Sequence, residues 1–254
     1  EQLTVYSAAQ MPHINRTGLS ECLGLEHGSI RVISPDVGGG FGYKGILLPE
    51  EVCLSGLTMR RGHPVRWIED RREHLTAGAN CREHHYRITG YADRDGRLRG
   101  IDCEATVDSG AYSSYPFSAC LEAAQVASIL PGPYDFEAYR CKTWSVANNK
   151  CPILPYRGVA RTGVCFAIEL ILDAIAREAG LEPHEVRFKN LVRPEQMPFD
   201  NITKKHFDSG DYPEALRRAL AHFDLPALRA RQAKGEPDGR LLGFGLSIYC
   251  EQGA

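Results

Sequence analysis

The sequence predicts an α+β (mixed α/β) fold, and three observations support this class. Strand-like and helix-like segments alternate along most of the chain, which is typical of sheets covered by helices. Two alternating runs within residues 86–109 flank the turn Asp93-Arg94-Asp95-Gly96 and predict an antiparallel hairpin. Residues 165–179 carry apolar side chains at helical spacing and form the clearest helix.

The N-terminal segment is predicted to form a strand, a helix and a second strand. Residues 3–7 and 30–34 are rich in strand-type side chains. Between them, Pro12 opens a helix over residues 14–23, and Gly24 ends it.

A second helix and a third strand are predicted next. Pro49 and two glutamates fit the first turn of a helix that runs to residue 61, with Gly62 at its end. Residues 64–68 are predicted to form a strand, and the hairpin of residues 86–109 follows, with Gly96 supplying the positive φ of its turn.

The second half of the chain is predicted to be mainly helical. Residues 136–147 are expected to form a strand before the helix of residues 165–179, which Gly180 ends. Pro183 then starts a helix that runs to residue 191.

Hydrophobic periodicity lapses over residues 190–211, which suggests a boundary between residues 1–195 and 196–254. Beyond it the sequence predicts amphipathic helices over residues 212–223 and 226–234, and a final strand over residues 241–249.

The composition is that of a soluble globular protein. Of 254 residues, 43% are hydrophobic and 24% are charged, which excludes disordered, collagen-like and coiled-coil chains. The net charge of −2 implies no general polyanion-binding surface, so we expect no nucleic-acid partner. The least charged stretch, residues 109–134, holds Glu122 and three prolines, so we expect no membrane span.

The chain has nine cysteines, an odd number without CxxC spacing. This pattern predicts neither a zinc site nor a disulfide framework. We expect reduced, mostly buried thiols in a cytoplasmic protein.

A glycine cluster, residues 38–42, follows the second predicted strand. Closely spaced glycines let backbone N–H groups point at a ligand and let the ligand approach without a Cβ in the way. The cluster is not a Walker A loop, because Lys44 is followed by Gly45. Residues 40–45 match GxGxxG, but their distance from the strand and from the next helix argues against a dinucleotide fold. Alone, the cluster leaves a structural turn and a ligand loop equally open.

A glycine-rich turn with Arg157 and Arg161 leads into the helix of residues 165–179. Two arginines at a helix N-terminus favour an anion. The alternative is a surface loop with two solvated arginines. Gln10, taken alone, would be a surface amide.

Four motifs follow one another along the chain: LTVYSAAQMPH at 3–13, DVGGGFGYK at 36–44, PYRGVAR at 155–161 and FAIE at 166–169. In this order they resemble the molybdenum-binding subunit of the xanthine dehydrogenase/aldehyde oxidase family, the molybdenum hydroxylases. The resemblance runs from about residue 2 to the end and implies a molybdopterin-binding domain of that type. Residues 1–195 would be its first molybdopterin-binding region, and residues 196–254 would lead into the missing second half.

The resemblance implies a molybdopterin cofactor, in the cytosine dinucleotide form, with molybdenum. It places Gln10 at an apical molybdenum oxygen, the Phe41 backbone next to the metal, and Arg157 beside the metal and pterin. Neutral and cationic donors of this kind stabilise charge on an anionic metal centre. The other cofactor-binding residues that it implies are Gly39, Gly40 and Gly42.

Two positions of the implied substrate pocket, Gly45 and Val159, depart from the xanthine-oxidising members, which carry glutamate and phenylalanine there. Purine oxidation is therefore disfavoured. Carbon monoxide dehydrogenases carry a cysteine where this chain has Gly158, so no molybdenum–copper site is expected. The resemblance then implies hydroxylation of an aldehyde or an N-heterocycle with oxygen derived from water.

The family's general base is a glutamate near the end of a much longer subunit, so we expect no catalytic residue in this chain and give Glu251 no such role. Both ends are strand-like, as in an excised piece or a split subunit, and the isolated chain is expected to be inactive. The implied partners are the rest of the molybdenum subunit and subunits or domains that carry iron–sulfur clusters and FAD. The alternatives are a non-redox phosphate- or nucleotide-binding module and a docking scaffold.

Overall fold

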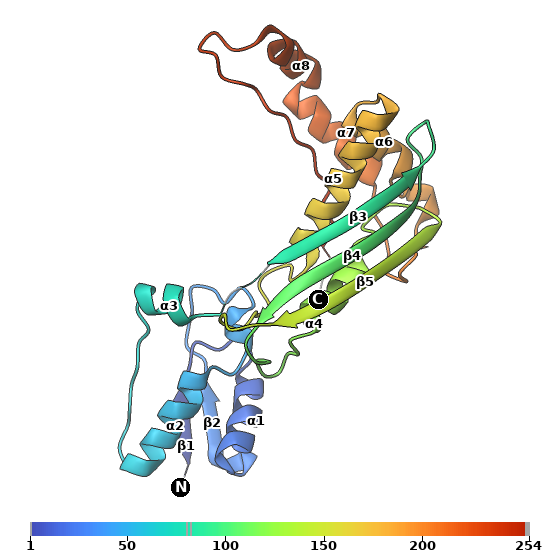
Figure 1. Ribbon diagram of the computed structural model, residues 1–254. Helices are drawn as coiled ribbons and strands as arrows, with labels where there is room; N and C mark the ends of the chain where they lie inside the picture. Colours follow the sequence, from blue (N-terminus) through green and yellow to red (C-terminus); the bar gives the residue numbers. More distant parts are fainter. Residues whose placement is uncertain (1, 80, 82, 252–254) are drawn as a thin grey trace. The chain divides into compact units, whose positions relative to one another are not determined.

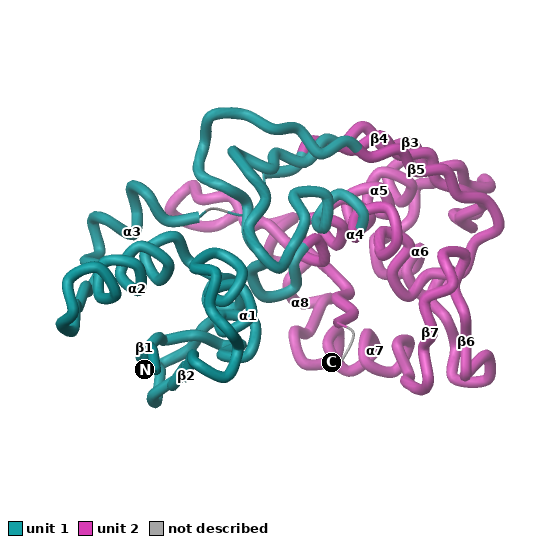
Figure 2. The backbone as a smooth tube through the Cα atoms, turned by 90° about the horizontal axis from the view of Figure 1, so that it is seen from below, with its two compact units in different colours: residues 1–84, 106–124, 144–159 teal, residues 85–105, 125–143, 160–254 magenta. Residues whose placement is uncertain are grey.

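The structure is a computed structural model that describes residues 2–79, 81 and 83–251, and it confirms the mixed α/β class (Figure 1). The chain divides into two compact units that interleave in sequence (Figure 2). Unit 1 comprises residues 1–84, 106–124 and 144–159, and unit 2 comprises residues 85–105, 125–143 and 160–254. The predicted division between residues 1–195 and 196–254 concerns cofactor binding and stays a prediction.

The start of unit 1 is built as predicted. Strands β1 (Leu3–Tyr6) and β2 (Ile30–Ile33) pair in parallel, from Leu3 opposite Ile30 to Tyr6 opposite Ile33. Helix α1 (Pro12–Leu23) makes the connection that a parallel pair requires. Helix α2 (Pro49–Arg61) packs against β1 and α1.

Proline and glycine delimit the helices as the sequence predicts. The missing N–H of a proline is harmless in the first turn, and glycine adopts the left-handed conformation at the C-terminal cap at little cost. Prolines at a helix start are Pro12, Pro49 and Pro183, and glycines at a left-handed cap are Gly24, Gly62 and Gly180.

A three-stranded sheet follows in the order β3-β4-β5. Strands β3 (His84–Ala92) and β4 (Leu98–Gly110) form the predicted hairpin, and Gly96 has φ of 82° in its turn. Strand β5 (Ala138–Ala147) lies on the other side of β4. Its connection to β4 contains helix α4 (Leu121–Ile129), which the sequence analysis missed because its apolar residues show little amphipathic periodicity.

Helices dominate the rest of unit 2. Helix α5 begins four residues earlier than predicted, and a Cβ on Gly90 of β3 would lie 2.6 Å from Ile171, so this strand and helix are in close contact. None of the described helices is long and apolar enough to cross a membrane. The elements are α5 (Arg161–Ala179), α6 (Pro183–Asn190), the hairpin β6 (Phe199–Asp200) and β7 (His206–Phe207), α7 (Tyr212–Phe223) and α8 (Leu225–Lys234).

A buried charge cluster joins the elements of unit 2. Arg187 of α6 has no exposed surface and donates from Nε to Oε2 of Glu169 at 2.8 Å and from Nη1 to Asp173 at 2.8 Å. Its Nη2 donates to the Leu246 carbonyl at 3.0 Å, and the Tyr134 hydroxyl donates to Glu169 at 2.5 Å. Burial raises the pKa of Tyr134, and the Glu169 charge adds to the effect. This arginine therefore links α5, α6 and the C-terminal segment.

Two predicted strands are wrong, residues 64–68 and 241–249, which form no ladder with any described strand. A strand needs a neighbour for its backbone hydrogen bonds, and alternation in the sequence does not supply one. Helix α3 (Arg71–Ala77) was missed as well; an N-cap bond from the Glu73 amide to the Asp70 carboxylate starts it.

All nine cysteines are free thiols, but the expectation that most are buried is wrong. Cys103 is buried, whereas Cys22, Cys53 and Cys120 are exposed. The preference of cysteine for the interior is an average over proteins and does not decide single positions.

Candidate functional site

The glycine loop of unit 1, residues 38–42, lies against Gln10, which follows β1. The Gly42 N–H donates to Gln10 Oε1 at 2.8 Å, and the Gln10 N–H donates to the Lys44 carbonyl at 2.8 Å. A Cβ on Gly40 would lie 2.4 Å from Gln10 Oε1, so a side chain at residue 40 would displace the amide. The loop and Gln10 therefore form one local structure.

The hydrogen bond from Gly42 determines what Gln10 can offer a ligand. An amide side chain has one acceptor end and one end with two N–H donors. Since Oε1 accepts from Gly42, the Nε2 donors are the groups that the exposed Gln10 can present.

The turn that contains Arg157 is attached to the same loop. The Arg157 N–H donates to the Phe41 carbonyl at 2.8 Å, and the rings of Phe41 and Tyr156 are 6.4 Å apart. A Cβ on Gly42, whose φ is 96°, would lie 2.4 Å from the Pro155 carbonyl oxygen. Three segments that are distant in sequence thus meet at Gln10, Phe41 and Arg157, and the role of these residues in cofactor binding stays a prediction.

Two side-chain-bearing residues of this site adopt a conformation that favours glycine. Phe41 has φ of 54° and Val159 has φ of 47°. Gly158, with φ of 88°, lies within a tight turn closed by the Val159 N–H and the Tyr156 carbonyl at 2.6 Å. Positive φ costs free energy in a β-branched or bulky residue and clusters at functional sites. Phe41 is nevertheless 54% exposed, which is consistent with a ligand-binding surface.

The two arginines of the motif have different positions. Arg157 is exposed in the turn of unit 1. Arg161 is the first residue of α5 rather than part of the turn, and its Nε lies 3.1 Å from the Glu251 carboxylate in unit 2. The expectation that both arginines share one turn is therefore wrong.

Gly45 and Val159, the implied substrate-pocket residues, both lie near the ring of Phe117, which was not predicted from the sequence. Gly45 is buried, and a Cβ there would lie 3.4 Å from Met11 Cε and 3.9 Å from Phe117 Cε2. Val159 and Phe117 line one small pocket. No motif marks Phe117, because it lies among small polar residues in a segment that reads as a loop. The role of Gly45 and Val159 in substrate binding stays a prediction.

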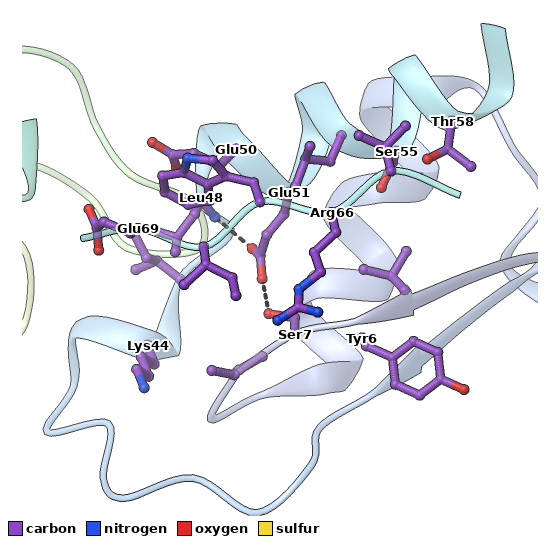
Figure 3. A pocket seen from close by; sticks show the side chains of 18 of the residues that line it. Tyr6, Ser7, Lys44, Leu48, Glu50, Glu51, Ser55, Thr58, Arg66 and Glu69 are labelled. Atoms are coloured by element: carbon purple, nitrogen blue, oxygen red, sulfur yellow. Dashed lines mark hydrogen bonds between the residues drawn. The ribbon is translucent and has the colours of Figure 1, made fainter. Parts of the chain in front are cut away.

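A groove of about 1780 Å³ runs along β1 and includes Gly39, Gly40, Phe41 and Tyr156 in its lining. Glu51 of α2 projects into it (Figure 3). Its carboxylate accepts from the Leu48 N–H at 2.8 Å, from Asn15 Nδ2 at 2.7 Å and from the Ser7 hydroxyl. Burial raises the pKa of Glu51. Glu51 therefore ties α2 to β1 and α1, and it was not marked by any sequence motif.

The donors of the site suit an anionic organic cofactor. Among the described residues no group of three or more His, Cys, Asp or Glu side chains is placed to hold a metal ion. The groups that meet at the glycine loop are an amide, a guanidinium and glycine backbone without Cβ atoms. These residues fit a metal that arrives with its own organic ligands better than a metal held by side chains alone.

Most of the chain is similar in sequence to known proteins. Residues 1–191 match the family model described as the molybdopterin cofactor-binding domain. The chain is 35% identical to the nicotine 6-hydroxylase large subunit of Paenarthrobacter nicotinovorans, over 99% of this chain and 31% of that protein. It is also 35% identical to the carbon monoxide dehydrogenase large chain of Hydrogenophaga pseudoflava, over 98% and 32%.

A solved structure shows the same fold. Quinoline 2-oxidoreductase from Pseudomonas putida 86 matches with a TM-score of 0.88 and 36% identity, over 92% of this chain and 30% of that chain. The chain therefore spans about a third of the length of the relatives that it matches.

Proposed function

Because the chain belongs to the molybdopterin cofactor-binding domain family, we propose that it is the first cofactor-binding region of a molybdenum hydroxylase. The observation that carries the proposal is the convergence of Gln10, the glycine loop and the Arg157 turn, which backbone and side-chain hydrogen bonds hold together. Residues 1–195 make this region, and residues 196–254 lead toward the rest of the cofactor-binding subunit.

The bound cofactor supplies the redox chemistry. The chain holds and orients it. Because they have no Cβ, Gly40 lies close against Gln10 and Gly42 lies close against the Pro155 carbonyl, where a larger side chain would collide. Gln10 donates from Nε2 to an acceptor oxygen, and Arg157 balances negative charge. The exposed rings of Phe41 and Tyr156 offer the cofactor an apolar surface.

The general base and the electron carriers lie outside this chain in our proposal. The base is a glutamate of the remaining part of the subunit, and partner subunits or domains carry iron–sulfur clusters and FAD. The relatives support such partners, because their names describe a large subunit, a large chain and a complex subunit. We place the enzyme in the cytoplasm and the cofactor in its cytosine dinucleotide form.

We infer that the substrate is an aromatic N-heterocycle, with an aldehyde as the alternative. Two relatives that are 35% and 36% identical to this chain over the aligned region are named for nicotine and quinoline. The aldehyde oxidoreductase from Desulfovibrio gigas is 23% identical and shows the fold alone.

Hydroxylation with oxygen from water is the expected result for the complete enzyme. In ¹⁸O-labelled water, quinoline or a related N-heterocycle should give a hydroxylated product that carries ¹⁸O, as mass spectrometry would show. Xanthine should be a poor substrate by kcat/KM, because Gly45 and Val159 offer neither a carboxylate nor an aromatic ring to a purine. Label derived from molecular oxygen would contradict the reaction, and comparable kcat/KM for xanthine and the best heterocycle would contradict the specificity.

A further inference from the structure

Cys103 of β4 and Cys141 of β5 lie abreast on neighbouring strands within unit 2. The separation of 38 positions between them equals that of two ion pairs. Asp102–Arg140 joins the same two strands, and Arg99–Glu137 joins β4 to the residue directly before β5. Since side chains alternate along a strand, the thiols lie on the face opposite the Asp102–Arg140 pair. The separation of adjacent strands is about 4.7–4.9 Å.

The two thiols interact directly. The Cys103 S–H donates to the Cys141 sulfur, which raises the pKa of Cys103 and lowers the pKa of Cys141 to about 7. Burial and Asp102 oppose the lowering at Cys141, while the Tyr139 hydroxyl supports it. Cys103 is buried and Cys141 is half-buried. Cys141 is thus the partly exposed thiol with the lowered pKa, and Cys103 is the buried thiol that donates to it.

Other cysteines of the chain differ from Cys141. Burial raises the pKa of Cys165 and of Cys250, which keeps these thiols protonated at neutral pH. A partly exposed thiolate beside a second thiol is the arrangement of a redox-active pair.

We propose that Cys103 and Cys141 form a redox-active dithiol that hydroperoxides oxidise to a disulfide. The site lies outside the proposed cofactor site and does not depend on it. A disulfide requires Cα atoms roughly 4.4–6.8 Å apart, which residues abreast on adjacent strands satisfy without backbone movement.

The chemistry balances with hydrogen peroxide as the oxidant. The Cys141 thiolate attacks one peroxide oxygen, so an S–O bond forms, the O–O bond breaks, and hydroxide leaves and takes up a proton to give water. The sulfur is oxidised by two electrons to sulfenic acid. Cys103 then attacks this sulfur, the S–S bond forms, and the S–O bond breaks with loss of a second water that carries the Cys103 proton. Two thiols and one peroxide thus give one disulfide and two waters.

Peptide mapping of the complete enzyme tests the proposal. After hydrogen peroxide treatment near neutral pH, alkylation and tryptic digestion without reductant, we expect a cross-link between residues 100–140 and the dipeptide Cys141-Lys142. Two alkylatable thiols per chain should be lost, and dithiothreitol should restore both.

Two variants identify the cysteine that pairs with Cys141. The peptide of residues 100–140 also contains the exposed Cys120, so Cys120→Ser is the matched control and should keep the cross-link. Cys103→Ser should abolish it and leave a sulfenic acid at Cys141 that reacts with dimedone. Complete alkylation of wild-type Cys141 after peroxide would overturn the proposal, as would loss of the cross-link in Cys120→Ser. The Cys120→Ser comparison does not depend on how well the Cys103 variant folds.

Discussion

Turnover of the complete enzyme is expected to fall about 10²–10³-fold when Gln10 is replaced by alanine, the loss of roughly 2.7–4 kcal/mol typical of one preorganised donor. The amide of Gln10 accepts from Gly42 and so presents its Nε2 donors to the ligand. Steady-state kinetics would measure the effect, and molybdenum analysis should show that the cofactor remains bound, because one donor among several is lost.

Gln10→Glu separates two roles of this side chain, donation to the ligand and acceptance of the hydrogen bond from the glycine loop. Glutamate keeps an acceptor for the Gly42 N–H but has no amide donors. The turnover of this variant should therefore also be low, while Gln2→Ala, at an exposed glutamine, should leave turnover unchanged. Wild-type turnover in Gln10→Ala would contradict the role of this amide.

Arg187→Leu is expected to lower the local stability of unit 2 by roughly 3–5 kcal/mol, because it leaves a buried carboxylate without its partner. Glu169 is 4% exposed, and its Oε2 accepts from Arg187. Amide hydrogen exchange of α5 and α6 in the complete subunit would measure the change as faster exchange. Replacing both Arg187 and Glu169 by methionine should restore most of the protection, since the uncompensated charge is then removed.

The control for this cluster is an exposed ion pair in the same unit. Arg217→Ala removes a surface partner of Glu214 on α7, and such pairs contribute about 0.2–1 kcal/mol. Equal exchange in Arg187→Leu and Arg217→Ala would contradict the role of the buried cluster.

Elements set by local chemistry could be predicted from the sequence. The hairpin around Gly96 and the helices that begin at Pro49 or end at Gly180 follow from residues next to each other in the chain. The segments 64–68 and 241–249 have strand-type composition as well, but a strand exists only where a neighbour accepts its hydrogen bonds. That information is not local.

The candidate site also combines features set by neighbouring residues with features that depend on residues far apart in the chain. The motifs around Gln10, Phe41 and Arg157 marked segments that lie together in the fold, but the bond from Gly42 to Gln10 joins residues 32 positions apart and could only be seen in the structure. Phe117 was not predicted, because its position next to Gly45 depends on how an irregular segment folds. The buried ion pair between Arg187 and Glu169 could not be predicted either, since charged residues are usually exposed.

In the function that we propose, this chain holds a molybdenum cofactor through the glycine loop. The most direct measurement is the molybdenum and pterin content of the purified complete enzyme, with wild type and Gly42→Val compared. We predict stoichiometric molybdenum and pterin in wild type and a large loss of both in the variant, because a Cβ at residue 42 would collide with the Pro155 carbonyl. An active wild-type enzyme without molybdenum would contradict the claim.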